Sequence, residues 1–123
     1  MDLFLMSPPG RGWALRGRSN FRSREAAPAD ARGARREWLT LARHIESRGG
    51  TVVALPSPSD ALTGMPYAAE CGQVVAREGQ APLFLLPRMM SAHRFTERDH
   101  WTPLARRLGL EVVDPGVGIW EAH

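Results

Sequence analysis

The chain has 123 residues, and a domain of that size buries roughly two thirds of the surface that its unfolded chain exposes. Hydrophobic residues make up 43% and charged residues 24%, a balance that is typical of a folded globular protein and argues against a disordered chain. No apolar run approaches the length needed to span a membrane. The formal net charge is +3, and all 16 of the Lys and Arg residues are arginine.

Cys71 is the single cysteine, so no internal disulfide can form, which fits a reducing, cytoplasmic location. The opening segment "MDLFLMSPPG" lacks a basic leader, and we interpret it as a first strand rather than a signal peptide. The sequence shows no glycine-rich phosphate loop and no cluster with metal-ligand spacing. We therefore expect neither a metal nor a cofactor.

The first half of the chain predicts a strand, a helix and a second strand. The strand at 2–7 ends at a Pro-Pro-Gly stretch, and residues 10–28 form a long loop rich in Gly, Arg and Ser. Asp30 is a suitable N-cap for a helix over 31–48. The apolar face of that helix is formed by Ala34, Trp38, Leu41, Ala42 and Ile45. A β-branched strand follows at 51–56.

The second half predicts a hairpin, a helix and a further strand. Residues 71–77 and 82–87 are the two hairpin strands. A helical signal covers 96–108, and we expect the regular helix to begin near Pro103, with Thr102 as its cap. A strand at 110–115 comes next, and residues 117–121 read as the start of another strand.

This order of elements predicts an α/β fold built from two similar units, at about 2–56 and 65–115, followed by a stub at 117–123. The helix-to-strand connections are very short in both units, "RGG" in the first and a single glycine in the second. Sequence identity between the two units is low, so the repeat rests on the pattern of elements alone.

Five short stretches, taken in order, resemble one enzyme family. "LFLMSPP" followed by "SNF" resembles the family's opening strand and its Asn-containing loop, which places Asn20 at that Asn. "EWLTLARHIESRGGTVVALP" resembles the first helix and the strand after it. "MPYAAECG" resembles a Phe-Thr-Ala-Asn-Ala-Gly or Phe-x-x-Asp segment, with Tyr67 at the Phe and Glu70 at the Asn or Asp. "HRFTE" resembles an Arg-x-x-Glu element that begins at Arg94. "WEAH" resembles the start of Phe-Glu-Gly-x-Gly-Asp, with Glu121 at the Glu.

The family is that of the amidinotransferases and dimethylargininase-like enzymes, which modify guanidino groups and have the pentein fold. That resemblance implies an α/β propeller of five ββαβ units around a pseudo-fivefold axis, of which this chain would hold about two units and the first strand of a third. Residues 1–123 would then be a single domain that forms the N-terminal fragment of a larger pentein domain. Two departures from the family pattern are Glu70, which is longer than Asp and charged unlike Asn, and Ala122, which replaces a Gly.

The resemblance also implies that the catalytic machinery is incomplete in this sequence. The family's catalytic His lies tens of residues beyond its Phe-Glu-Gly motif, and its nucleophilic Cys lies near the end of a chain about twice this long. We therefore expect the chain alone to be inactive and the reading frame to continue with Gly-Asp after His123. Expressed alone, it should self-associate or aggregate through exposed apolar surface and an unpaired strand edge.

Members of the family attack a guanidinium carbon, and the resemblance assigns roles in that chemistry to four residues. A carboxylate matches the planar fork of guanidinium N–H groups in a bidentate way, which suits Glu121 as the catalytic-site acid and Glu70 as a substrate-binding one. Arg94 would pair with a substrate carboxylate, and Tyr67 would lie against the guanidinium face. The expected ligand is a small guanidino compound such as arginine or a derivative of it.

Each of these residues also has an ordinary structural interpretation. Glu121 and Glu70 suit solvated surface positions, Tyr67 suits core or edge packing, and Arg94 suits a surface ion pair with Glu97 or Asp99. Cys71 is predicted to be a buried, inert thiol rather than a nucleophile. Whether the enzyme hydrolyses its substrate or transfers the amidino group stays open.

An alternative function from another class also fits the composition. Eight arginines lie between Arg11 and Arg36, and a small, complete α/β module could use this loop to hold an anionic partner or nucleic acid. Acidic residues interrupt the run and no aromatic ladder accompanies it, so nucleic-acid binding is the less favoured outcome. Salt-dependent binding to an anionic partner would support this alternative.

Overall fold

The computed structural model describes residues 2–14 and 25–120 of the chain. The chain divides into two compact units, residues 1–66 and residues 67–123, and each unit is described by itself. Within the described ranges, no helix combines the length and the apolar character that crossing a membrane requires.

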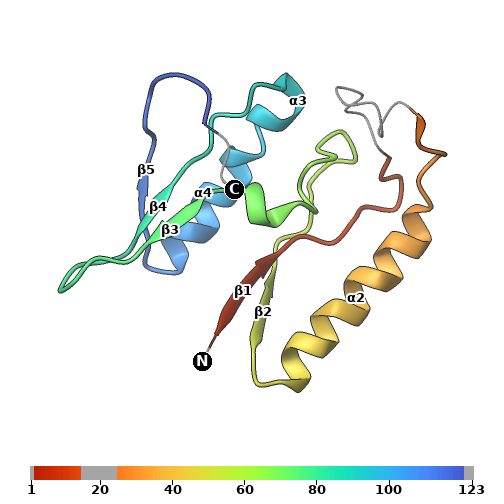
Figure 1. Cartoon of the computed structure of the whole chain (residues 1–123), viewed down its shortest axis with the longest axis horizontal. Helices are drawn as coiled ribbons and strands as arrows, with labels where there is room; N and C mark the ends of the chain where they lie inside the picture. Colours follow the sequence, from red (N-terminus) through yellow and green to blue (C-terminus); the bar gives the residue numbers. More distant parts are fainter. Residues whose placement is uncertain (1, 15–24, 121–123) are drawn as a thin grey trace. The chain divides into compact units, whose positions relative to one another are not determined.

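The first unit is a parallel strand pair joined by one long helix. β1 (Leu3–Met6) pairs in parallel with β2 (Thr51–Ala54), and the register runs from Leu3 opposite Thr51 to Met6 opposite Ala54. α2 (Ala31–Ser47) connects them and lies alongside the pair (Figure 1). A parallel pair needs such a crossover because the chain must return to the end of the sheet at which the first strand began before the second strand can start. The strand, helix and strand predicted for this half are confirmed.

The start of α2 and part of its apolar face follow the signals in the sequence. The Asp30 carboxylate accepts a hydrogen bond from the Gly33 amide at 2.9 Å, which confirms Asp30 as the N-cap. On the predicted apolar face Ala42 is buried, whereas Leu41 is exposed. Leu41 lies at the edge of the apolar stripe farthest from Ala42 around the helix, so it falls outside the packed surface.

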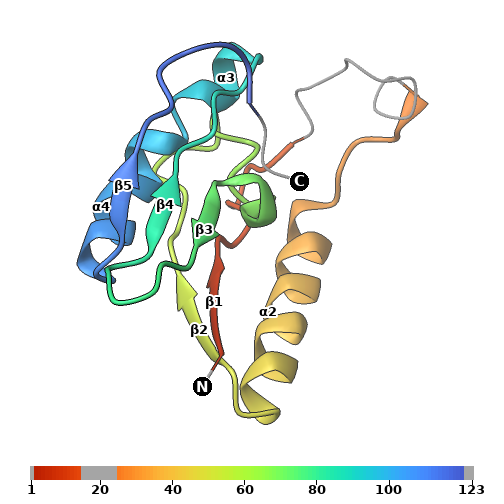
Figure 2. The same ribbon diagram turned by 60° about the vertical axis from the view of Figure 1, so that its left-hand side comes forward.

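The second unit is a three-stranded sheet backed by a helix. β3 (Gln73–Val75) and β4 (Leu83–Leu85) form an antiparallel hairpin, and β5 (Glu111–Val113) pairs in parallel with β4. α4 (Arg98–Arg107) makes the crossover between β4 and β5 and lies along one side of this sheet (Figure 2). The centre of the core is formed by Phe84, Trp101 and Ala105, each about 1% exposed.

The predicted start of the second helix is wrong. α4 begins at Arg98, Pro103 lies inside it, and the Thr102 hydroxyl donates back to the Arg98 carbonyl at 2.8 Å instead of capping. Pro103 is the sixth residue of α4, so it removes only one helical hydrogen bond, the one that would reach the carbonyl of Asp99. Asp99 and Pro103 are both exposed, so water can take the place of the missing amide and donate a hydrogen bond to the Asp99 carbonyl. A separate short helix, α3 (Ala92–Phe95), precedes α4 and was not predicted.

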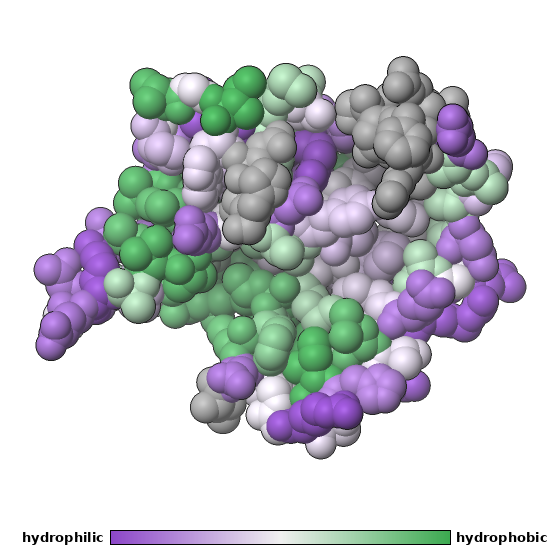
Figure 3. Space-filling model, viewed as in Figure 1, coloured by the Kyte–Doolittle hydropathy of each residue, from purple (hydrophilic) through white to green (hydrophobic). Residues whose placement is uncertain are grey.

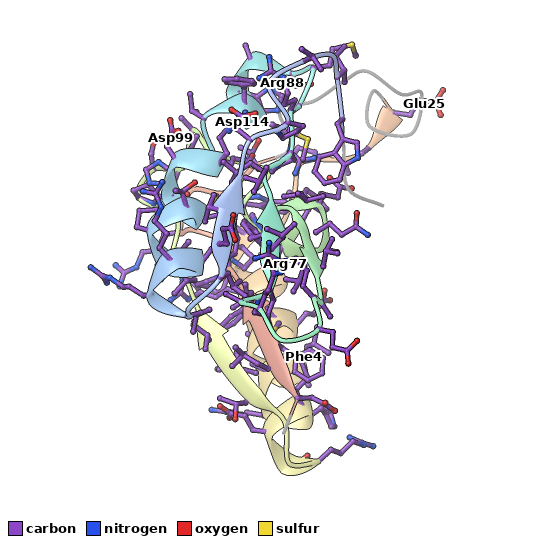
Figure 4. All side chains as sticks on the ribbon, turned by 90° about the vertical axis from the view of Figure 1, so that its left-hand side faces the viewer. Phe4, Glu25, Arg77, Arg88, Asp99 and Asp114 are labelled. Atoms are coloured by element: carbon purple, nitrogen blue, oxygen red, sulfur yellow. The ribbon has the colours of Figure 1, made fainter. Side chains whose placement is uncertain are left out.

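The strand predicted at 117–121 is not found in its described part, 117–120. Trp120 alone makes a bridge, with Arg88, through backbone hydrogen bonds of 2.7 and 3.1 Å. Gly116 and Gly118 have positive φ, so the backbone turns repeatedly where a strand would be extended. Side chains hold this turn: Arg88 donates to the Gly118 carbonyl at 3.0 Å and lies 3.5 Å from the Asp114 carboxylate (Figure 4).

Replacing Gly72 by alanine is expected to destabilise the second unit. Gly72 has φ +150°, and an added Cβ would lie 2.6 Å from the Phe84 ring and 2.7 Å from the Leu85 carbonyl oxygen. Overpacking and backbone strain together should cost about 2 kcal/mol or more. In Gly79→Ala the new Cβ meets nothing within 4 Å, so only the strain of its positive φ of +68° remains. That control should therefore lose only about 1 kcal/mol of unfolding free energy. Urea unfolding of both variants measures the difference, and equal losses would contradict the described packing.

Large apolar side chains remain on the surface of both units. In the first unit Leu3 and Phe4 on β1 are exposed, and in the second Val74, Met90, Val117 and Ile119 are exposed. Figure 3 shows hydrophobic surface over β1 and over the three-stranded sheet. Self-association of the isolated chain stays a prediction. In sedimentation velocity we expect larger species that grow with concentration. A chain that sediments as a monomer and melts cooperatively by circular dichroism would contradict this expectation.

Candidate functional site

The Arg94 guanidinium is contacted by three other side chains of the second unit, those of Tyr67, Glu70 and Glu97. Tyr67 precedes the 3₁₀ turn Ala68–Glu70 and Glu70 is its last residue; the Glu70 amide donates a hydrogen bond to the Tyr67 carbonyl at 3.0 Å. Arg94 lies on α3, and Glu97 occupies the N-cap position immediately before α4. The order 3₁₀ turn, hairpin and α3 therefore brings Glu70 beside Arg94, although 24 positions separate them in the chain.

Arg94 forms ion pairs with two carboxylates through different atoms. Its Nη1 donates to Glu70 Oε2. Its Nε and Nη2 both lie 3.4 Å from the oxygens of Glu97, so that carboxylate faces one edge of the guanidinium with two parallel contacts. The Tyr67 ring centroid lies 5.8 Å from the Arg94 Cζ, within the range of a cation–π contact.

Exposure differs sharply between the two carboxylates. The Glu97 side chain is 5% exposed and the Arg94 side chain 17%, whereas the Glu70 side chain is 38% exposed. Burial by itself lowers the pKa of Arg94, but the hydrogen bond to Glu70 and the charge of Glu97 outweigh it and raise that pKa above its usual range. Arg94 is therefore a permanent cation held between one buried and one accessible acid.

The sequence-predicted site residues are brought together only in part. Glu70, Arg94 and Tyr67 meet in one cluster, whereas Glu121 lies outside the described residues, as does Asn20, which was matched only to the family's Asn-containing loop. Of the two partners suggested for Arg94 as an ordinary ion pair, Glu97 is found, and the pair is largely buried rather than on the surface. The direct pairing of Glu70 with Arg94 was not predicted. No local sequence pattern indicates this pair, because the two residues lie on separate elements.

Cys71 is a buried thiol, as predicted. Burial raises its pKa from 9.0 to about 12, so the nucleophilic thiolate is scarce at neutral pH. In the folded protein this thiol should resist iodoacetamide at pH 8, and it should react readily once the chain is unfolded in urea. Mass spectrometry of the Cys71 peptide measures both rates.

Because the pKa of Cys71 is higher in the folded than in the unfolded protein, the thiol's contribution to stability is complete below pH 9 and is lost as the pH rises toward 12.

The described part of the chain contains no group of three or more His, Cys, Asp or Glu residues that could hold a metal ion. The cluster around Arg94 instead combines a cation, two anions and an aromatic face. Such a set is suited to a ligand that is itself charged and planar.

No protein-family model and no curated protein matches the sequence. Solved structures do match. The N-terminal domain of ArgZ bound to product, an arginine dihydrolase from the ornithine–ammonia cycle in Cyanobacteria, matches with a TM-score of 0.82 and 19% identity, over 99% of this chain and 43% of that one.

Two further structures of the same kind match over nearly the whole chain. A binary complex of the AgrE C264A mutant with L-arginine has a TM-score of 0.80 and 19% identity, and it covers 98% of this chain and 17% of that one. A dimethylarginine dimethylaminohydrolase adduct has a TM-score of 0.66 and 14% identity, covering 98% and 43%. The chain therefore spans less than half of each of these proteins.

These structures confirm, at the level of the fold, the resemblance to guanidine-modifying enzymes that the sequence motifs indicated. The chain is a mixed α/β protein that shares the fold of part of those domains. Because the identities are below 20%, the comparison leaves the roles of individual residues to be argued from the site itself.

Proposed function

We propose that this chain is the N-terminal portion of an enzyme that modifies a guanidino group, either by hydrolysis or by amidino transfer. The observation that carries the proposal is the cluster itself: Glu70 already pairs with a guanidinium, that of Arg94, beside the face of Tyr67. The fold shared with arginine-modifying and dimethylarginine-modifying enzymes supports it. The proposed substrate is arginine or a close derivative.

In this proposal the chain supplies binding groups for the two ends of such a substrate. Glu70 and Glu121 hold the guanidinium, and Arg94 meets the substrate carboxylate. Holding the guanidinium on two sides orients its carbon for attack, and orientation of this kind contributes much of an enzyme's rate acceleration. The attacking thiolate and the proton-transferring His would follow His123 in the complete protein, as would the rest of the propeller.

Turnover of labelled arginine by the complete protein tests this function. With L-arginine labelled with ¹³C at the guanidino carbon and glycine as an amine acceptor, we expect the label to leave the arginine pool. Appearance of the labelled carbon in a ureido product, with release of ammonia, indicates hydrolysis, whereas appearance of the label on glycine indicates transfer. A folded complete protein that changes neither arginine nor methylated arginines would overturn the proposal.

A further inference from the structure

We propose that the Arg94–Glu70 ion pair is an internal competitor that a ligand must open, with Glu70 passing to the ligand's guanidinium and Arg94 to the ligand's carboxylate. This inference rests on the proposed function and adds a selection step to it. A ligand that carries both groups gives a new partner to Glu70 and to Arg94, whereas a ligand with one group separates the pair and gives a new partner to only one of them.

The first observation behind this inference is chemical identity. Glu70 binds a guanidinium of the protein itself, that of Arg94, and that guanidinium lies near the Tyr67 ring. A substrate guanidinium needs the same carboxylate geometry that Arg94 already uses. Arg94 and the substrate therefore compete for the Glu70 carboxylate.

The second observation is that the two ion pairs of Arg94 are separable. Glu70 contacts only the Nη1 end, and Glu97 faces the edge formed by Nε and Nη2. Glu97 is buried, so its carboxylate stays on Arg94 and compensates the arginine charge after Glu70 leaves. Glu70 is the accessible member, which makes it the one that exchanges.

Binding of three ligands distinguishes exchange, in which Glu70 leaves Arg94 for the ligand, from a purely structural role in which Glu70 only holds Arg94 in place. L-arginine carries both groups, n-butylguanidinium carries only the guanidinium, and L-norvaline carries only the amino-acid end. Isothermal titration calorimetry on the complete protein compares the wild type with Glu70→Gln and Arg94→Gln. Arg94→Lys is included because a lysine keeps the charge for Glu97 but lacks the guanidinium fork.

Exchange predicts that loss of one partner improves binding of the one-ended ligand that needs the other. Glu70→Gln should bind L-norvaline about five-fold more tightly than the wild type, and both Arg94 variants should bind n-butylguanidinium about five-fold more tightly. All three variants should bind L-arginine about ten-fold more weakly. Unchanged or weaker binding of the one-ended ligands would overturn the inference, because Glu70 would then only hold Arg94 in place.

Glu111→Gln is the matched control. It breaks the ion pair between Glu111 and Arg77 on another part of the same unit, and it should leave the affinity for all three ligands unchanged. Circular dichroism melting shows whether each variant is folded, and Arg94→Lys keeps the test available if Arg94→Gln is not. A folded wild type that neither binds nor converts L-arginine would reject the proposed function itself, an outcome distinct from failure of the exchange.

Discussion

Replacing Glu121 by glutamine in the complete protein is expected to lower kcat/KM for arginine by about 100-fold or more, with the fold intact. The reason is the role proposed for this carboxylate, which is to hold the substrate guanidinium in line for attack. Glutamine keeps the size but loses the charge and one of the two acceptor oxygens, and a misplaced reacting group can cost about 100-fold in rate. Steady-state kinetics on purified variants measures the effect.

Glu111→Gln serves again as the control for this experiment. Glu111 is on β5 and its ion pair with Arg77 lies at the far end of the sheet from the 3₁₀ turn of Glu70. We expect its kcat/KM to equal that of the wild type. A Glu121→Gln variant that keeps kcat/KM within about three-fold of the wild type would rule out the proposed role, because a bidentate charged contact is worth more than that.

The largest expected effect on stability is that of Trp101→Ala. Trp101 lies on α4 and is 1% exposed in the core of the second unit. Truncating a buried tryptophan removes its burial energy and leaves a cavity, at a cost of about 3–5 kcal/mol. Denaturant unfolding of the complete protein should show a lower midpoint for the transition that involves this unit.

A matched pair of variants separates volume from hydrogen bonding at this position. The indole Nε1 of Trp101 is buried and has no hydrogen-bond partner in the part of the chain that the structure describes. Trp101→Phe removes that unsatisfied donor and keeps most of the ring, so it should recover much of the stability that alanine loses. Leu41→Ala, at an exposed position, should change stability by no more than about 0.5 kcal/mol. An equally small effect of Trp101→Ala would contradict the described core.

The secondary structure was predictable where local signals were strong. Asp30 caps α2 as its side chain indicated, and the β-branched and apolar runs marked each strand. Pro103 was misleading because a proline usually marks the first turn of a helix, where no amide donor is needed. Inside α4 it removes only one hydrogen bond, and the loss costs little because the position is exposed. The turn before Trp120 was missed because apolar letters at 117–120 do not reveal the positive φ angles of Gly116 and Gly118.

The candidate site was predictable only through the family resemblance. Composition and spacing give Glu70 and Arg94 no distinction from any other surface charge, and their pairing depends on how the 3₁₀ turn and α3 pack. Glu97 could be suggested as a partner because it lies three residues from Arg94, within reach on a helical turn. Long-range pairing of this kind needs the tertiary structure.

The proposed substrate site is tested most directly by a crystal structure of the complete protein with L-arginine bound, obtained with its predicted catalytic cysteine replaced by alanine. We predict that the ligand guanidinium lies between the carboxylates of Glu70 and Glu121 and that the ligand carboxylate contacts Arg94, which remains paired with Glu97. An arginine bound elsewhere, or one bound with the Arg94–Glu70 pair still closed, would contradict this prediction.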